Sequence, residues 1–118
     1  MPIDKKWLGR YGEDRACEYL SKLGYQILDR NAQTRAGELD IVASTGKTLV
    51  FVEVKTRTSE SAGHPFSAVT ESKLARIRRL AAEWCANHQT NNVQVRFDVI
   101  GVMLRAGKVS IEHLVQVC

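Results

Sequence analysis

Two runs of residues typical of β-strands, joined by a short polar turn, constrain the fold of this chain most strongly. Residues 39–43 and 48–56 are rich in Val, Ile and Phe, and the Ser-Thr-Gly-Lys sequence between them is typical of a hairpin turn. In a hairpin that is symmetric about this turn, Asp40 lies directly opposite Glu53. A shift of one residue in the turn would place these two side chains on opposite faces of the sheet.

The sequence around this hairpin predicts an α/β fold, in which a central mixed sheet is flanked by helices. The expected helices cover residues 7–23 and 70–87, the further strands cover 25–29, 93–104 and 109–115, and loops cover 30–37 and 57–66. The loop at 57–66 contains Gly63 and Pro65 and is expected to be mobile at one edge of the site. A length of 118 residues suits a single domain that covers residues 1–118.

The charge of the chain favours a polyanionic partner. The 17 Lys and Arg residues against 13 Asp and Glu residues give a formal net charge of +4. The chain contains no phosphate-binding loop of the NTPases, no nucleophile elbow of the serine hydrolases and no dinucleotide-binding fingerprint. These three classes are therefore set aside.

The cysteines and the N-terminal sequence indicate a cytoplasmic protein. Cys17, Cys85 and Cys118 are far apart and lack Cys-x-x-Cys spacing, so we expect reduced thiols and no structural zinc. The first seven residues contain no signal-peptide core, and the longest apolar run is too short to span a membrane. We therefore expect a cytoplasmic location and no membrane partner.

Acidic residues interrupt the two central strands, which are otherwise apolar. Because side chains alternate along a strand, Glu53 shares one face with Lys55, and Glu38 shares one face with Asp40. Facing carboxylates at Asp40 and Glu53, roughly 5 Å apart at Cβ, repel one another unless a cation lies between them. Oxygen ligands favour Mg²⁺ or Mn²⁺ over zinc. The pair therefore predicts a divalent-metal site, with Glu38 either as an outer group or as a solvated surface acid.

A helical glutamate and a strand lysine extend this predicted site. Glu13 lies on the apolar stripe of the first helix, where an unpaired charge would be costly, so we expect it to complete the metal shell directly or through water. Lys55 is predicted to position the attacking water or to stabilise developing charge. Together with Asp40 and Glu53, these residues supply the groups that phosphodiester hydrolysis needs.

Four sequence motifs carry a family resemblance. They are Gly-x-x-Gly-Glu at 9–13, Gly-Glu-Leu-Asp-Ile-Val-Ala at 37–43, Val-Phe-Val-Glu-Val-Lys-Thr-Arg at 50–57 and Arg-Phe-Asp-Val-Ile at 96–100. In this order, over nearly the whole chain, they resemble the YraN-like family of bacterial proteins. That family is largely uncharacterised and is assigned to the PD-(D/E)XK superfamily, the restriction-endonuclease-like nucleases that include archaeal Holliday junction resolvases.

The resemblance implies a metal-dependent endonuclease that acts on DNA. It places the metal ligands at Asp40 and Glu53, the lysine at Lys55 and the helical glutamate at Glu13. Leu39 stands where the superfamily commonly has Pro, a position at which its members vary. The similarity to junction resolvases further implies structured or branched DNA as the substrate, and a homodimer.

Several further residues have both a functional and a structural interpretation. Candidates for binding nucleic acid are Arg57, Lys73, Arg76 and Arg79, and a solvated helix face is the alternative for the last three. Trp84 is expected to pack in the core, whereas Trp7 could stack on bases. The predicted partner of Asp98 is Arg96, and His113 has no partner at a recognisable spacing.

Two other functions are compatible with the same residues. One is a nucleic-acid-binding module that keeps the acidic site but does not cleave. The other is a structural or protein-interaction domain, in which Asp40, Glu53 and Lys55 form a cross-strand salt bridge on a solvated sheet face. Metal-dependent cleavage would distinguish a nuclease from the non-cleaving module. Binding of metal or DNA would distinguish both of these from a structural or protein-interaction domain.

Overall fold

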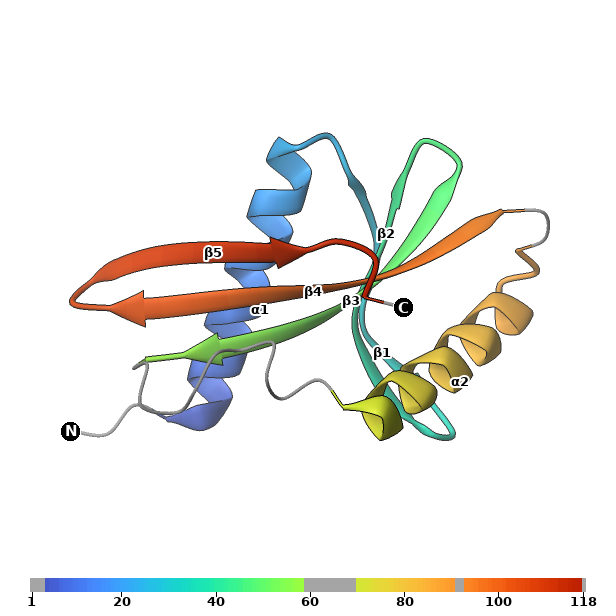
Figure 1. The fold of residues 1–118 in the computed structure, drawn as a ribbon, viewed down its shortest axis with the longest axis horizontal. Coiled ribbons are helices and arrows are strands. Elements are labelled where there is room, and N and C mark those ends of the chain that lie inside the picture. The colour runs from blue at the N-terminus through green and yellow to red at the C-terminus, as the bar shows by residue number, and fades with distance from the viewer. Residues whose placement is uncertain (1–3, 59–69, 91–92, 118) are drawn as a thin grey trace.

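A mixed sheet of five strands forms the centre of the computed structural model, which describes residues 4–58, 70–90 and 93–117 (Figure 1). The elements are, in chain order, α1 (Lys5–Lys22), β1 (Gln26–Thr34), β2 (Gly37–Thr45), β3 (Thr48–Arg57), α2 (Glu71–Asn87), β4 (Gln94–Arg105) and β5 (Lys108–Leu114). The strands lie in the order β1-β2-β3-β4-β5. Neighbouring strands are antiparallel except β3 and β4, which are parallel and are connected through α2. This is the predicted α/β architecture, and it is consistent with a restriction-endonuclease-like fold.

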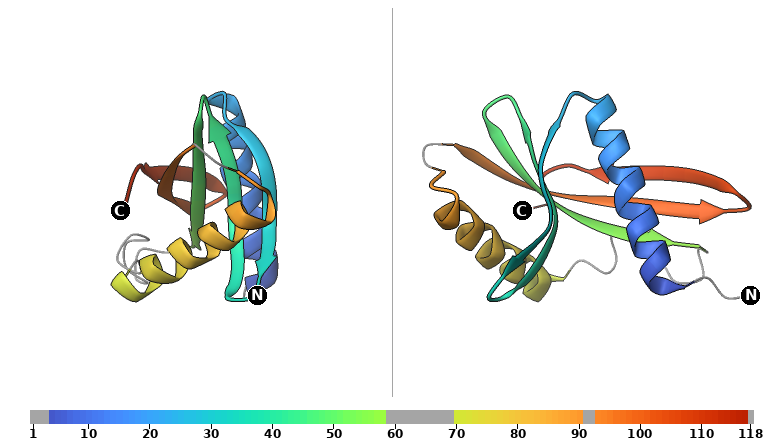
Figure 2. Two further views of the ribbon diagram at one scale, coloured as in Figure 1. Left: turned by 90° about the vertical axis from the view of Figure 1, so that its right-hand side faces the viewer. Right: turned by 180° about the vertical axis from the view of Figure 1, so that it is seen from behind.

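The two helices pack on opposite faces of the sheet (Figure 2). Leu20 of α1 belongs to a core that includes Val52 of β3, whereas Trp84 of α2 belongs to a second core that includes Phe51. Because side chains alternate along a strand, these adjacent residues of β3 face opposite sides. Trp84 is 5% exposed, which confirms that it is a core residue. Within the described residues, no helix is both long and apolar enough to cross a membrane.

The β2–β3 hairpin has the register that the sequence predicts. The pairs run from Thr45 opposite Thr48 at the turn to Ile41 opposite Val52. Continued by one step, this register would place Asp40 opposite Glu53. The hairpin therefore lacks the one-residue shift that would have placed Asp40 and Glu53 on opposite faces of the sheet.

The first strand is longer than the sequence predicts, so the predicted loop at 30–37 is wrong. β1 extends to Thr34 and β2 begins at Gly37. The segment is polar and Thr34 is its only β-branched residue, but pairing with apolar β2 buries Ala32 opposite Leu39 and overrides this local preference. Asn31 has a φ of 52°, so the strand is irregular at this residue.

Smaller differences concern where elements begin and end. The side chain of Asp4 accepts a hydrogen bond from the backbone N–H of Lys6, and this cap starts α1 at Lys5 rather than at the predicted residue 7. Arg57 is the last residue of β3 rather than the first of a loop. Most of the loop predicted at 57–66 lies outside the described residues.

Candidate functional site

The candidate site lies where β2 and β3 separate. Between the described residues of these strands, the paired positions end at Ile41 and Val52. One step further, the Asp40 carboxylate takes the place of a backbone partner, since its Oδ2 accepts a hydrogen bond of 2.9 Å from the Val54 N–H. Figure 2 shows β2 and β3 diverging away from the turn that joins them. We call the place where they separate the fork, and β3 carries Glu53 and Lys55 there.

Asp40 and Glu53 are electrostatically coupled in this fork. Burial raises the pKa of Asp40 to about 7, with the Glu53 carboxylate as the next largest cause. Glu13 raises this pKa further, and Lys55 lowers it. The other three residues predicted for the site, Glu13, Glu53 and Lys55, therefore all act on the charge of Asp40.

Lys55 faces Glu53 along the strand. Its Nζ lies 3.6 Å from Glu53 Oε1, and the two side chains are 28% and 16% exposed. This contact agrees with the predicted placement of both residues on one face of β3. The lysine is close enough to the acidic pair to act on a group that binds there.

A close approach of α1 to β3 brings Glu13 to the same place. Gly12 makes this approach possible, because a Cβ at this position would lie only 1.8 Å from Thr56 Oγ1. The Glu13 side chain is 15% exposed, and its Oε1 is buried without a hydrogen-bond partner in the described part of the chain. Burial raises the pKa of Glu13, while a hydrogen bond with Asn31 and the charge of Arg30, 3.9 Å away, act in the opposite direction.

The donor set fits a divalent cation that is held mainly by two carboxylates. A bound cation would favour the ionised forms of Asp40 and Glu13, whose pKa is raised, and would offset the burial of a carboxylate oxygen that has no hydrogen-bond partner among the described residues. Among the described residues, however, no three or more His, Cys, Asp or Glu side chains form a preassembled cluster able to hold a metal ion. Mg²⁺ commonly uses one or two carboxylates and keeps several waters. Asp40 and Glu53 could therefore hold such an ion, with Glu13 reaching it through water.

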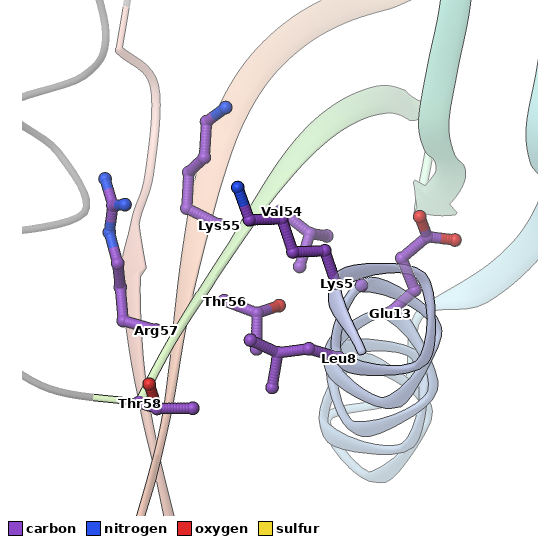
Figure 3. A pocket seen from close by; sticks show the side chains of 9 residues that line it. Lys5, Leu8, Glu13, Val54, Lys55, Thr56, Arg57 and Thr58 are labelled. Atoms are coloured by element: carbon purple, nitrogen blue, oxygen red, sulfur yellow. The ribbon is translucent and has the colours of Figure 1, made fainter. Parts of the chain in front are cut away.

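The other predicted polar residues divide into two groups. Arg57 lines a pocket of about 400 Å³ together with Lys55 and Glu13 (Figure 3). The residues that do not line this pocket are Lys73, Arg76 and Arg79 of α2 and the exposed Glu38. Glu38 Oε2 accepts a hydrogen bond of 2.6 Å from Gln33 Nε2, as a solvated surface acid can.

Three further sequence interpretations concern aromatic and thiol side chains. Trp7 is 45% exposed and stacks on Tyr11 with ring centroids 5.0 Å apart, so base stacking by Trp7 stays a prediction. Cys17 is buried and Cys85 packs against the second core, and both are free thiols. Cys118 lies outside the described residues.

A second polar cluster, centred on Asp98, is only partly predicted. Asp98 is 1% exposed and accepts two hydrogen bonds of 2.9 Å from Arg96, which confirms the predicted charge pair. His113 has no partner at a recognisable sequence spacing, and in the structure its Nε2 lies 2.7 Å from Asp98 Oδ2. His113 Nδ1 is 3.0 Å from Tyr19 Oη, and Arg96 donates to Tyr25 Oη. Pairing of β4 with β5 brings His113 to Asp98, whereas Tyr19 comes from α1 and Tyr25 precedes β1, so local residue spacing carries no signal for these contacts.

Sequence comparison assigns the chain to a family. The model of Uncharacterised protein family UPF0102 matches residues 12–102, which include all four residues of the candidate site. A UPF0102 protein of Beutenbergia cavernae is 51% identical over 93% of this chain and 94% of its own length. A UPF0102 protein of Paenarthrobacter aurescens is 49% identical over 97% of this chain and 95% of its own length. The chain belongs to the UPF0102 family, so the YraN-like resemblance is confirmed at the level of the family.

Proposed function

We propose that this protein is a Mg²⁺- or Mn²⁺-dependent endonuclease that hydrolyses DNA phosphodiester bonds. The observation that carries the proposal is the coupled pair of Asp40 and Glu53, with Lys55 Nζ 3.6 Å from the Glu53 carboxylate. An acidic pair with an adjacent lysine supplies the groups that metal-assisted phosphoryl transfer requires. Membership in the PD-(D/E)XK superfamily, structured or branched DNA as substrate and a homodimeric assembly are parts of the same proposal.

The residues would have separate roles in the reaction. Asp40 and Glu53 would hold a Mg²⁺ or Mn²⁺ ion, which supplies a polarised phosphoryl oxygen and a bound water of lowered pKa. Lys55 would orient the attacking water or neutralise charge that develops on the phosphoryl oxygens. Glu13 would accept a hydrogen bond from a water at the acidic pair, through the buried Oε1 that has no hydrogen-bond partner among the described residues.

The test is metal-dependent cleavage of defined DNA. Labelled single-stranded, duplex, flap and four-way DNA would be incubated with the protein and Mg²⁺, Mn²⁺ or EDTA. We expect cleavage with either metal and none in EDTA. The variants Asp40→Asn and Glu53→Gln should lose at least about a hundredfold in rate, typical of lost charge stabilisation at a reacting centre. DNA binding should persist in both.

A matched control separates the site from general loss of acidic charge. Asp14→Asn removes an exposed carboxylate one residue from Glu13, and we expect it to cleave at the parent rate. Undiminished cleavage by both Asp40→Asn and Glu53→Gln would refute the proposed site.

A second function, nucleic-acid binding without cleavage, is favoured by one specific observation. The described residues form no preassembled cluster of three or more metal-binding side chains. This alternative would be correct if none of the four DNAs is cut with either metal while each is bound with a salt-dependent affinity.

A further inference from the structure

A basic pocket adjoins the acidic pair on the side of the α1 N-terminus. It is formed where the first turns of α1 face the last residues of β3, beyond the point at which β2 has turned away. Its lining residues are Lys5, Leu8, Gly9, Glu13, Val54, Lys55, Thr56, Arg57 and Thr58. Lys55 and Glu13 thus belong both to this pocket and to the proposed catalytic site.

The chemistry of the pocket suits an anion. Three cations, Lys5, Lys55 and Arg57, line it against the single carboxylate of Glu13. Figure 3 shows the Lys55 and Arg57 side chains extending from the same side of β3, whereas Thr56 points toward Leu8 of α1. Cationic and hydroxyl groups together are typical of contacts to phosphate.

Arg57 supplies the most specific observation. Its Nε is buried and has no hydrogen-bond partner among the described residues. A guanidinium N–H can only donate, and a buried donor without an acceptor is destabilising. Arg96 and Arg30, in contrast, pair with Asp98 and Asp14. Arg15 of α1 also has a buried Nε without a hydrogen-bond partner among the described residues, but it pairs with Glu18 through Nη2. An oxyanion bound to the Arg57 guanidinium would provide an acceptor where the described residues provide none for Nε.

The spacing along β3 relates this pocket to the acidic pair. Glu53, Lys55 and Arg57 alternate along the strand and therefore share a face. Arg57 lies four residues after Glu53 in β3. At a rise of about 3.3 Å per residue, the two residues are roughly 13 Å apart along the strand. Successive nucleotides of one strand in a duplex rise about 3.4 Å. A nucleic-acid strand that runs along β3 would thus place a phosphate near Arg57 a few nucleotides from the phosphate at the acidic pair.

We propose that Lys5, Arg57 and Thr58, at the end of the pocket away from the acidic pair, bind a backbone phosphate of the nucleic-acid substrate, a few nucleotides from the bond at Asp40 and Glu53. The inference rests on the proposed action on nucleic acid and identifies how the strand is held in register. Arg57 is a substrate-positioning residue, which binds the strand away from the reacting phosphate.

The test measures binding without metal, so it does not depend on cleavage. Fluorescence anisotropy of a labelled single-stranded DNA would be recorded in EDTA over a range of salt concentrations. Arg57→Ala should weaken binding about tenfold or more, since a hydrogen bond to a charged group contributes about 1.5–3 kcal/mol. It should also reduce the slope of log K against log[salt] by about 0.7, as expected when one phosphate contact is lost. Lys5→Ala should reduce affinity less, because Lys5 is exposed.

Matched variants distinguish a specific contact from general charge. Arg78→Ala and Lys22→Ala remove the same charges from exposed helix positions outside this pocket, and we expect affinity within about twofold of the parent. Arg57→Lys keeps the charge but lacks Nε, so it should recover only part of the affinity. Thermal melting of each variant would verify that it is folded.

The outcomes separate this inference from the proposed activity. If no DNA is cut with either metal but binding depends on Arg57, the pocket is established and the nuclease proposal fails. If DNA is cut but Arg57→Ala binds like the parent, the inference fails and the nuclease proposal stands. The inference also fails if the Arg78 and Lys22 variants weaken binding as much as Arg57→Ala does.

Discussion

At the scale of single residues, burial and the nearby Glu53 carboxylate disfavour the ionised form of Asp40. Its pKa is raised to about 7 in the folded protein, mainly by burial and then by Glu53, whereas an unfolded Asp titrates near 3.9. The folded state therefore binds more protons between about pH 4 and pH 7. Ionised Asp40 destabilises the metal-free protein fully above pH 7, and this penalty disappears below about pH 4.

Asp40→Asn should consequently stabilise the metal-free protein at pH 8. The amide removes the charge but can still accept the hydrogen bond of the Val54 N–H. We expect the free energy of unfolding to rise by an amount on the order of a few kcal/mol, and the gain to disappear below about pH 4. Urea denaturation across this pH range measures the difference. Glu38→Gln is the control, since this exposed acid should change stability by less than about 0.5 kcal/mol. A less stable Asp40→Asn protein at pH 8 would contradict the prediction.

The same carboxyl should make metal binding sensitive to pH. A proton on Asp40 competes with a metal ion, because only the carboxylate is an effective ligand. Affinity for Mn²⁺, measured by calorimetry, should therefore fall by up to about tenfold per pH unit below pH 7 and level off above it. Affinity that stays constant between pH 5 and pH 7 would exclude Asp40 as a ligand.

At the scale of elements, the distance between α1 and β3 determines whether Glu13 can reach the acidic pair. Gly12→Ala would force a methyl group against Thr56, since the added Cβ would lie 1.8 Å from Oγ1. We expect a loss of about 1–3 kcal/mol in the free energy of unfolding, the usual cost of overpacking. Displacement of α1 should also reduce cleavage, and thermal melting and the DNA assay report these two effects separately.

Gly9→Ala is a matched control for this helix. Gly9 lies in the same helix, and a Cβ there would meet nothing within 4 Å. The substitution should therefore stabilise the protein by up to about 1 kcal/mol through helix propensity. Equal stability changes for the two alanine variants would show that helix packing at Gly12 does not position α1.

Elements with a regular pattern were predictable from the sequence, and contacts between distant elements were not. The β2–β3 register follows from the turn composition, so the facing positions of Asp40 and Glu53 could be predicted. β1 was predicted too short because its second half is polar and depends on pairing with β2. Neither the separation of β2 from β3 nor the approach of α1 at Gly12 has a local sequence signal. The basic pocket depends on both, and only Arg57 among its cations was singled out as a nucleic-acid contact.

At the scale of the whole molecule, polar clusters occupy two separate parts of the sheet. The acidic pair lies in the fork between β2 and β3, whereas Asp98 joins β4 to His113 of β5 and accepts a hydrogen bond from the backbone N–H of Gln116. Burial alone would raise the pKa of Asp98, but the hydrogen bonds from His113 and Arg96 outweigh it and lower the pKa. The fork is therefore the proposed place of the chemistry, and the Asp98 cluster stabilises the fold through its paired charges.

Asp98→Asn should destabilise the protein without changing the chemistry of the fork. A lowered folded pKa stabilises the protein above the unfolded value near 3.9, and this contribution is lost as the pH falls through the folded pKa. At pH 7 the amide would leave Arg96 without its buried counter-charge, and we expect a loss on the order of 3 kcal/mol. The difference from the parent should shrink below about pH 4. Asp14→Asn, which breaks the exposed pair with Arg30, should cost less than about 1 kcal/mol. Chemical denaturation of both variants measures these losses, and similar losses at pH 7 would mean that the Asp98 cluster contributes no more than a surface ion pair.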